Sequence, residues 1–219
     1  MHSSRTIFLA SVFLLTLTYS VTAVGRWDTI PSLWPNAMVP YKLSKSVQNF
    51  DSKNNTILHA MEEIEAASCI HFMPRTTEDD FVELSAGFDC AGPTGRQGKA
   101  QVMQLMVPFC LERKKMLRQL LHLLGLPNEH QRPDRDSSIT VNWDNISPLD
   151  APLFAKLNKT DLPLEEMPYD YNSLTHPDGF FRAKTASIPT MTPLKEGVTV
   201  GKATGLSSGD INKLRLLYC

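Results

Sequence analysis

Residues 118–130 carry the most specific pattern in the chain: Arg118-Gln119-Leu120-Leu121-His122-Leu123-Leu124-Gly125-Leu126-Pro127-Asn128-Glu129-His130. The leucines recur with a helical period. Gly125 is the residue type that most often follows a helix end, and Pro127 keeps Leu126 out of helical geometry. The pattern therefore predicts a helix over Met116–Leu124 that stops at Gly125.

The same residues keep the frame of the zinc-binding motif H-E-x-x-H-x-x-G-x-x-H, in which the histidines bind the metal and the glutamate is the general base. Only His122 and Gly125 match it. Arg118 and Asn128 stand at the other two ligand positions, and Gln119 stands at the base position. A guanidinium has no lone pair to offer a cation, and an amide is no base. We therefore expect a site that binds no zinc and catalyses no hydrolysis, because zinc needs three or four good ligands.

The flanking sequence places this site in a family. The segments that carry the resemblance are, in order, Trp34–Tyr41, Ala60–Glu65, Cys69–Thr76, Gly95–Gly98 with Gln101, Glu129–Asp136, Ile139–Ile146 and Tyr169–His176. In these segments the chain resembles the astacin family of secreted zinc metalloendopeptidases, a branch of the metzincins. The resemblance runs from about Trp34 to Cys219. It implies an α+β fold of two lobes around a cleft, divided near residues 125–130. The N-terminal lobe would hold a mixed sheet and two long helices, and the C-terminal lobe would be irregular with a final helix.

Tyr169–His176 resembles the Met-turn of this family, which lies beneath the metal. Thr175 replaces the methionine, and Pro177 replaces the tyrosine that contacts the metal and stabilises the oxyanion. Two further positions of the implied catalytic site have thus lost their chemistry, while the surrounding sequence has kept the family pattern.

Three functions remain open on this sequence. The first is a secreted pseudoprotease without a cofactor that binds peptide or protein in the vestigial cleft. The second is an active zinc metalloendopeptidase with a rewired metal site, for which His122, His130 and His176 are the available imidazoles. The third is a structural extracellular component or the product of a decaying gene copy. We adopt the first, since two of the three zinc ligands and the general base are replaced.

The first 23 residues predict a secretory signal peptide. Met1–Arg5 is followed by an apolar run over Ile7–Leu17 and by small residues at Val21–Ala23. Residues 24–219 then form the astacin-like domain, and we expect a secreted, extracellular protein without an inhibitory propeptide. The net charge of −1 does not favour nucleic acid, and no other segment predicts membrane insertion. We expect a monomer.

Four cysteines in a secreted chain predict two disulfides, and three pairings are possible. The astacin resemblance implies Cys69–Cys219 and Cys90–Cys110. Sequons at Asn54, Asn145 and Asn158 predict glycosylation.

Periodicity places three further elements. Apolar residues spaced for one helix face predict a helix over Asn55–Ala67. Asp80–Leu84 reads as a buried strand. A capping box at Ser207–Asp210 predicts a final helix that leads to Cys219, and residues 150–178 read as loop.

Two charged residues next to the site need partners. In the family, the glutamate after the third histidine meets the ammonium of the mature N-terminus, so we expect Glu129 to pair with the N-terminus left by signal cleavage. A buried carboxylate without a partner is costly. We expect Arg118 to stand in for the charge of the missing metal and to meet a polar group or a carboxylate.

Overall fold

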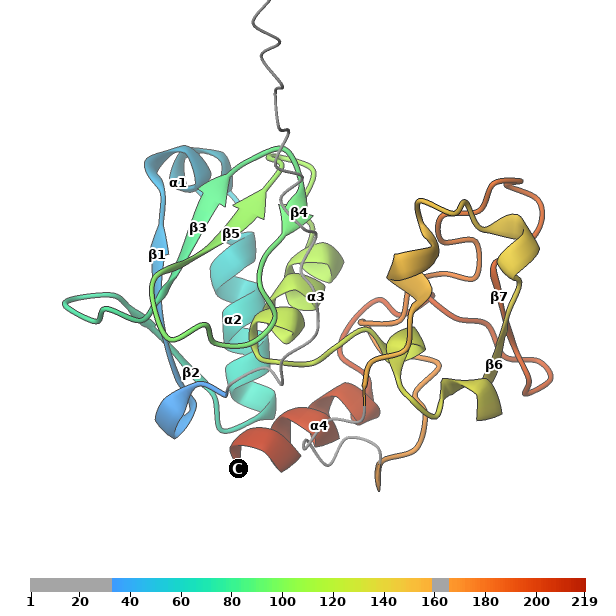
Figure 1. Cartoon of the computed structure of the whole chain (residues 1–219). Coiled ribbons are helices and arrows are strands. Elements are labelled where there is room, and N and C mark those ends of the chain that lie inside the picture. The colour runs from blue at the N-terminus through green and yellow to red at the C-terminus, as the bar shows by residue number, and fades with distance from the viewer. Residues whose placement is uncertain (1–32, 159–165) are drawn as a thin grey trace, which may run out of the picture.

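The computed structural model describes residues 33–158 and 166–219 (Figure 1). Its N-terminal part is built on one mixed sheet of five strands in the order β2-β1-β3-β5-β4. β4 pairs antiparallel with β5, and the other neighbouring strands are parallel. The strands are β1 Met38–Leu43, β2 His71–Pro74, β3 Val82–Ala86, β4 Cys90–Ala91 and β5 Gln101–Leu105.

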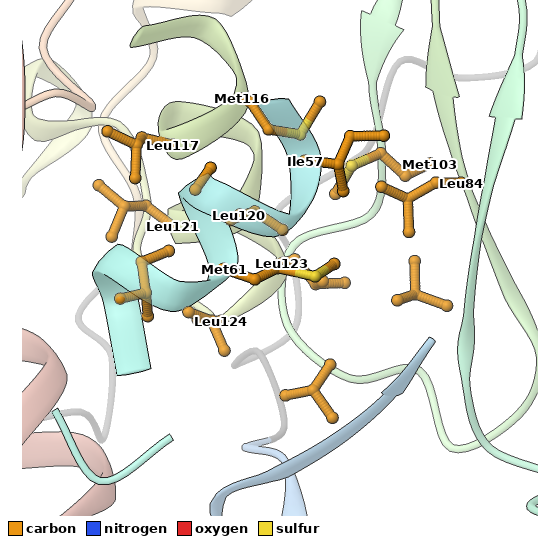
Figure 2. Packing of buried hydrophobic residues seen from close by; sticks show 14 of the residues in the cluster. Ile57, Met61, Leu84, Met103, Met116, Leu117, Leu120, Leu121, Leu123 and Leu124 are labelled. Atoms are coloured by element: carbon orange, nitrogen blue, oxygen red, sulfur yellow. The ribbon is translucent and has the colours of Figure 1, made fainter. Parts of the chain in front are cut away.

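Three helices accompany the sheet: α1 Lys45–Asp51, α2 Thr56–Ala67 and α3 Arg113–Leu123. α2 and α3 lie side by side and pack against the sheet (Figure 1). Figure 2 shows Leu84 and Met103 of the sheet projecting toward Ile57 of α2. All three side chains are at most 1% exposed, and burial of this kind stabilises the fold by about 1.5–3 kcal/mol for each large apolar side chain. This core fixes the position of α3.

The part after Gly125 is irregular and has a second, smaller core. Short 3-10 turns dominate it: η2 Glu129–Gln131, η3 Arg135–Ser137, η4 Trp143–Asn145 and η5 Ala151–Phe154. A two-stranded antiparallel sheet joins β6 Ile139–Val141 to β7 Met191–Pro193. Ile139, Ile146, Phe154 and Met191 form the buried core of this part.

The final helix, α4 Ser208–Tyr218, returns to the N-terminal part (Figure 1). The disulfide Cys69–Cys219 fixes its end, and the Tyr218 hydroxyl donates to Leu124 O at 2.8 Å. A second disulfide, Cys90–Cys110, ties β4 to the segment between β5 and α3. Both predicted pairings are confirmed.

The predicted elements are present with shifted bounds. α2 begins one residue later than the expected helix, and β3 covers Val82–Ala86 rather than Asp80–Leu84. α3 begins at Arg113 instead of Met116, because its first turn carries only charged residues and shows no apolar period. The predicted signal peptide lies outside the described residues. No helix in the described ranges is long and apolar enough to cross a membrane.

Candidate functional site

The end of α3 builds the floor of the candidate site. Gly125 has φ +94° and closes a Schellman motif, in which its own N–H donates to His122 O and the N–H of Leu126 donates to Leu121 O. Only glycine adopts this left-handed conformation without strain. The chain therefore leaves the helix as predicted and carries Asn128 back toward the helix face that holds Arg118 and His122.

Arg118 and Asn128, which occupy two ligand positions of the motif, are bonded to each other. Arg118 Nη2 donates to Asn128 Oδ1 at 2.7 Å, and Arg118 Nη1 donates to Leu174 O at 3.2 Å. The Nδ2 atom of Asn128 donates to Gln131 Oε1 at 2.8 Å. The prediction that Arg118 meets a polar group is confirmed. Burial lowers the pKa of Arg118 to about 10, against the opposing influence of the Asp178 and Asp210 carboxylates.

His122, one turn along α3 from Arg118, is held by the turn that follows the helix. Its Nδ1 lies 2.8 Å from Leu126 O, and because a carbonyl only accepts, Nδ1 carries the proton. Burial, followed by the charge of Arg118, lowers the pKa of His122 to about 3. The imidazole is therefore neutral at physiological pH.

The other two imidazoles of the rewired-site alternative are engaged elsewhere. His176 uses Nδ1 to donate to Pro177 O at 2.7 Å, and its Nε2 lies 2.6 Å from the Tyr169 hydroxyl. His130 Nε2 donates to Leu153 O at 3.0 Å. The structure does not gather these side chains into a metal site: within the described ranges, no group of three or more His, Cys, Asp or Glu side chains could hold a metal ion.

The loop that carries Thr175 is fastened to the start of α4. Asp210, the last residue of the predicted capping box, accepts from Ser173 Oγ at 2.6 Å and from the N–H of Leu174 at 2.9 Å. Thr175 is 1% exposed and its hydroxyl meets Ser173 Oγ at 2.9 Å. α4 thus sets the position of the Leu174 carbonyl that accepts from Arg118.

Glu129 is held by two cations that the sequence prediction did not include. Its Oε2 contacts the ammonium of Lys213 on α4, and its Oε1 accepts from Arg132 Nη1 at 3.2 Å and from the N–H of Asp170 at 2.8 Å. The Glu129, Arg132 and Lys213 side chains are each at most 5% exposed. The N-terminus that we expected as the partner lies outside the described residues. Lys213 and Arg132 are the cations that neutralise this carboxylate in the structure.

The sequons fall in different environments. Asn54 and Asn158 are exposed. Asn145 is 5% exposed, its Nδ2 donates to Thr185 O and Ile188 O, and its Oδ1 accepts from the N–H of Thr185. The nitrogen of Asn145 that would carry the sugar is buried and bonded, which disfavours a glycan there, and glycosylation of the three sequons stays a prediction.

Comparison with known proteins decides the family. The family model for astacin, a family of peptidases, matches residues 27–219. The chain belongs to the astacin family. It is 34% identical over 200 residues to zinc metalloproteinase nas-5 of Caenorhabditis elegans, a match that covers 88% of this chain and 55% of that protein. It is also 34% identical over 193 residues to the astacin-like metalloendopeptidase of Mus musculus, a match that covers 84% of this chain and 43% of that protein. The chain thus spans about half the length of these curated relatives.

A solved astacin-type structure confirms the predicted fold. High choriolytic enzyme 1, a hatching enzyme zinc-protease from Oryzias latipes (medaka fish), superposes with a TM-score of 0.78 at 30% sequence identity. The superposition covers 86% of this chain and 94% of that chain. The chain therefore has the astacin-like fold, with its mixed sheet and its final helix.

The residues at the family's zinc site do not fit zinc. Of the three motif positions, only His122 offers a lone pair that zinc prefers. Arg118 brings a fixed positive charge, and the hydrogen bond between Arg118 and Asn128 Oδ1 takes up the amide oxygen. Gln119 is half-buried on α3 and has no carboxylate to act as a base. Pro177 is buried and has no hydroxyl to offer an oxyanion.

Sequence reasoning missed three groups that shape this site. They are the Leu126 carbonyl, the Leu174 carbonyl and the ammonium of Lys213. Backbone carbonyls carry no residue-type signal, and Lys213 lies in a polar segment of α4 that reads as a solvated face. Only the three-dimensional arrangement reveals these contacts.

Proposed function

We propose that this chain is a secreted, zinc-free astacin homologue without peptidase activity, which binds a peptide or protein segment at its vestigial site. The hydrogen bond of 2.7 Å between Arg118 Nη2 and Asn128 Oδ1 is the observation that carries the proposal. This contact joins two side chains at zinc-ligand positions, which supports a contact within the chain at these positions in place of a metal site.

Secretion is part of the proposal. The apolar run over Ile7–Leu17 and the two disulfides favour an oxidising compartment outside the cytosol. A binding role is supported by the scaffold, since the buried network of Glu129, Arg132 and Lys213 and the capping box of α4 hold the loops in place around α3.

The test uses the full secreted chain. Casein and a pool of fluorogenic peptides are incubated with the protein, with and without added zinc, and binding of a pool of random octapeptides is measured in parallel. The proposal expects no cleavage and saturable retention of a subset of octapeptides. Cleavage that a chelator abolishes contradicts the loss of activity, and a pool that shows no saturable binding contradicts the binding role.

A further inference from the structure

Arg118 is a half-buried cation whose direct partners are neutral. Its two hydrogen bonds go to an amide oxygen, Asn128 Oδ1, and to a backbone carbonyl, Leu174 O. Across residues 33–158 and 166–219, no carboxylate lies within ion-pair distance of this guanidinium. A guanidinium has five N–H donors, so two hydrogen bonds leave it capable of more.

The two carboxylates that act on Arg118 through space are committed to other donors. Asp210 is fully buried and accepts from Ser173 Oγ, from the N–H of Leu174 and from the N–H of Ser207. Asp178 is exposed to solvent and accepts from the N–H of Phe180 at 2.8 Å. Solvent screens the charge of an exposed carboxylate. Burial therefore dominates, and it holds the pKa of Arg118 below its usual value.

Arg113, on the first turn of the same helix, is a guanidinium that has a carboxylate partner. Its Nε and Nη2 atoms donate to the two oxygens of Glu63 at 2.9 and 2.7 Å. This is the bidentate geometry that makes arginine a preferred receptor for carboxylates. Arg118 has the same donors without such a partner.

The Asp178 and Asp210 carboxylates near Arg118 oppose an incoming anion, but solvent screens Asp178 and three hydrogen-bond donors engage Asp210. Asn128 and Thr175 are uncharged. A cation removed from water and paired only with neutral acceptors gains more from an anion than a solvated one does.

We propose that Arg118 is an anion-binding residue and that the ligand of this site presents a carboxylate to it. The inference rests on the proposed function, because it names the chemistry of the peptide or protein that the vestigial site binds. The carboxylate can come from the C-terminus of the ligand or from an aspartate or glutamate side chain.

Acetate is the probe that tests the anion site without any peptide. The Nε–H signals of Arg118 and Arg113 are followed by NMR in the full chain as acetate replaces chloride at constant ionic strength. Arg113→Gln identifies the control signal and leaves the candidate site untouched. We expect a saturable shift of the Arg118 signal and no shift of the Arg113 signal. An Arg118 signal that stays fixed, or that moves in step with the Arg113 signal, overturns the proposal.

Three octapeptide pools separate the two carboxylate sources. One has a free C-terminus, one has an amidated C-terminus with a fixed glutamate, and one has an amidated C-terminus with glutamine in its place. We expect one of the first two pools to bind at least about tenfold more tightly than the third, which is worth about 1.4 kcal/mol. Arg118→Gln should remove the preference, and Arg118→Lys should retain part of it.

The outcomes distinguish the two proposals. Equal binding of all three pools, unchanged by Arg118→Gln, overturns the carboxylate and leaves peptide binding intact. If no pool binds, the proposed function fails, and the acetate titration still decides whether Arg118 is an anion site.

Discussion

Glu129 and Lys213 form a buried ion pair between residues that lie 84 positions apart in the chain. Glu129 follows the end of α3, and Lys213 belongs to the final helix. The contact therefore couples α4 to the turn that carries Asn128, and through it to the partner of Arg118. Charges this deeply buried are retained only where they are paired.

Removal of the Lys213 ammonium should therefore destabilise the folded chain. Lys213→Met leaves Glu129 with Arg132 as its remaining cation among the described residues, and we expect the free energy of unfolding in urea to fall by about 3 kcal/mol. The matched control is Lys42→Met, which breaks the solvated pair between Lys42 and Glu83, and we expect it to cost less than about 1 kcal/mol. Equal losses in the free energy of unfolding would show that the buried pair stabilises the fold no more than the solvated pair does.

The buried imidazoles make stability depend on pH. Burial lowers the pKa values of His122, His130 and His176 to about 3, 3 and 4, from 6.5 in the unfolded chain. The surroundings that act on them include Arg118 for all three, Arg135 for His130, and Asp170 and Lys213 for His176. The three neutral imidazoles contribute fully to the free energy of unfolding above pH 6.5. This contribution falls as the pH drops, because the unfolded state then binds protons that the folded state does not.

Each histidine can contribute up to about 1.4 kcal/mol per pH unit in this range. We expect the urea midpoint to fall clearly between pH 7 and pH 5, and His176→Asn to show a smaller fall. A midpoint that is unchanged over this range contradicts neutral burial of these side chains.

Glycan mapping tests the local structure around η4. After secretion from a eukaryotic cell, we expect sugar on the exposed Asn54 and none on Asn145. The reason is that Asn145 is buried and its Nδ2 already donates to two carbonyls. Peptide mapping with and without a glycosidase gives the occupancy of each sequon. A glycan on Asn145 would mean that the loop over Thr185–Ile188 adopts another arrangement in the protein.

Restoring the three missing residues of the zinc-binding motif should restore zinc binding. In a variant with Arg118→His, Gln119→Glu and Asn128→His, the scaffold presents three imidazoles from positions that the helix end already sets. We expect about one zinc ion per chain, measured by mass spectrometry of the dialysed protein. The control adds His122→Gln to the three changes and should lose the metal. Zinc retained by that control would place the ion elsewhere.

Much of the fold follows from the sequence because its signals are local. The leucines before Gly125, the spacing in α2 and the capping box at Ser207–Asp210 each predict an element within a few residues of its true bounds. The sequence does not predict α1, because Lys45–Asp51 lacks an apolar period and its only buried apolar residue is Val47.

The sequence predicts less of the candidate site than of the fold. The residue types at the motif positions predict the loss of zinc chemistry, since that chemistry depends on identity alone. The partners that replace the metal come from distant segments: Leu174 lies 56 residues from Arg118, and Lys213 lies 84 residues from Glu129. Such contacts leave no trace in spacing or periodicity.

The zinc content of the purified wild-type chain tests the central claim most directly. The full chain is secreted, dialysed against buffer with a known zinc concentration, and measured by mass spectrometry beside a catalytically intact astacin. We predict less than about 0.1 zinc ions per chain, because His122 alone cannot hold the ion where Arg118 and Asn128 bind each other. A stoichiometry near one, with zinc that a chelator removes and that returns on dialysis, would contradict it.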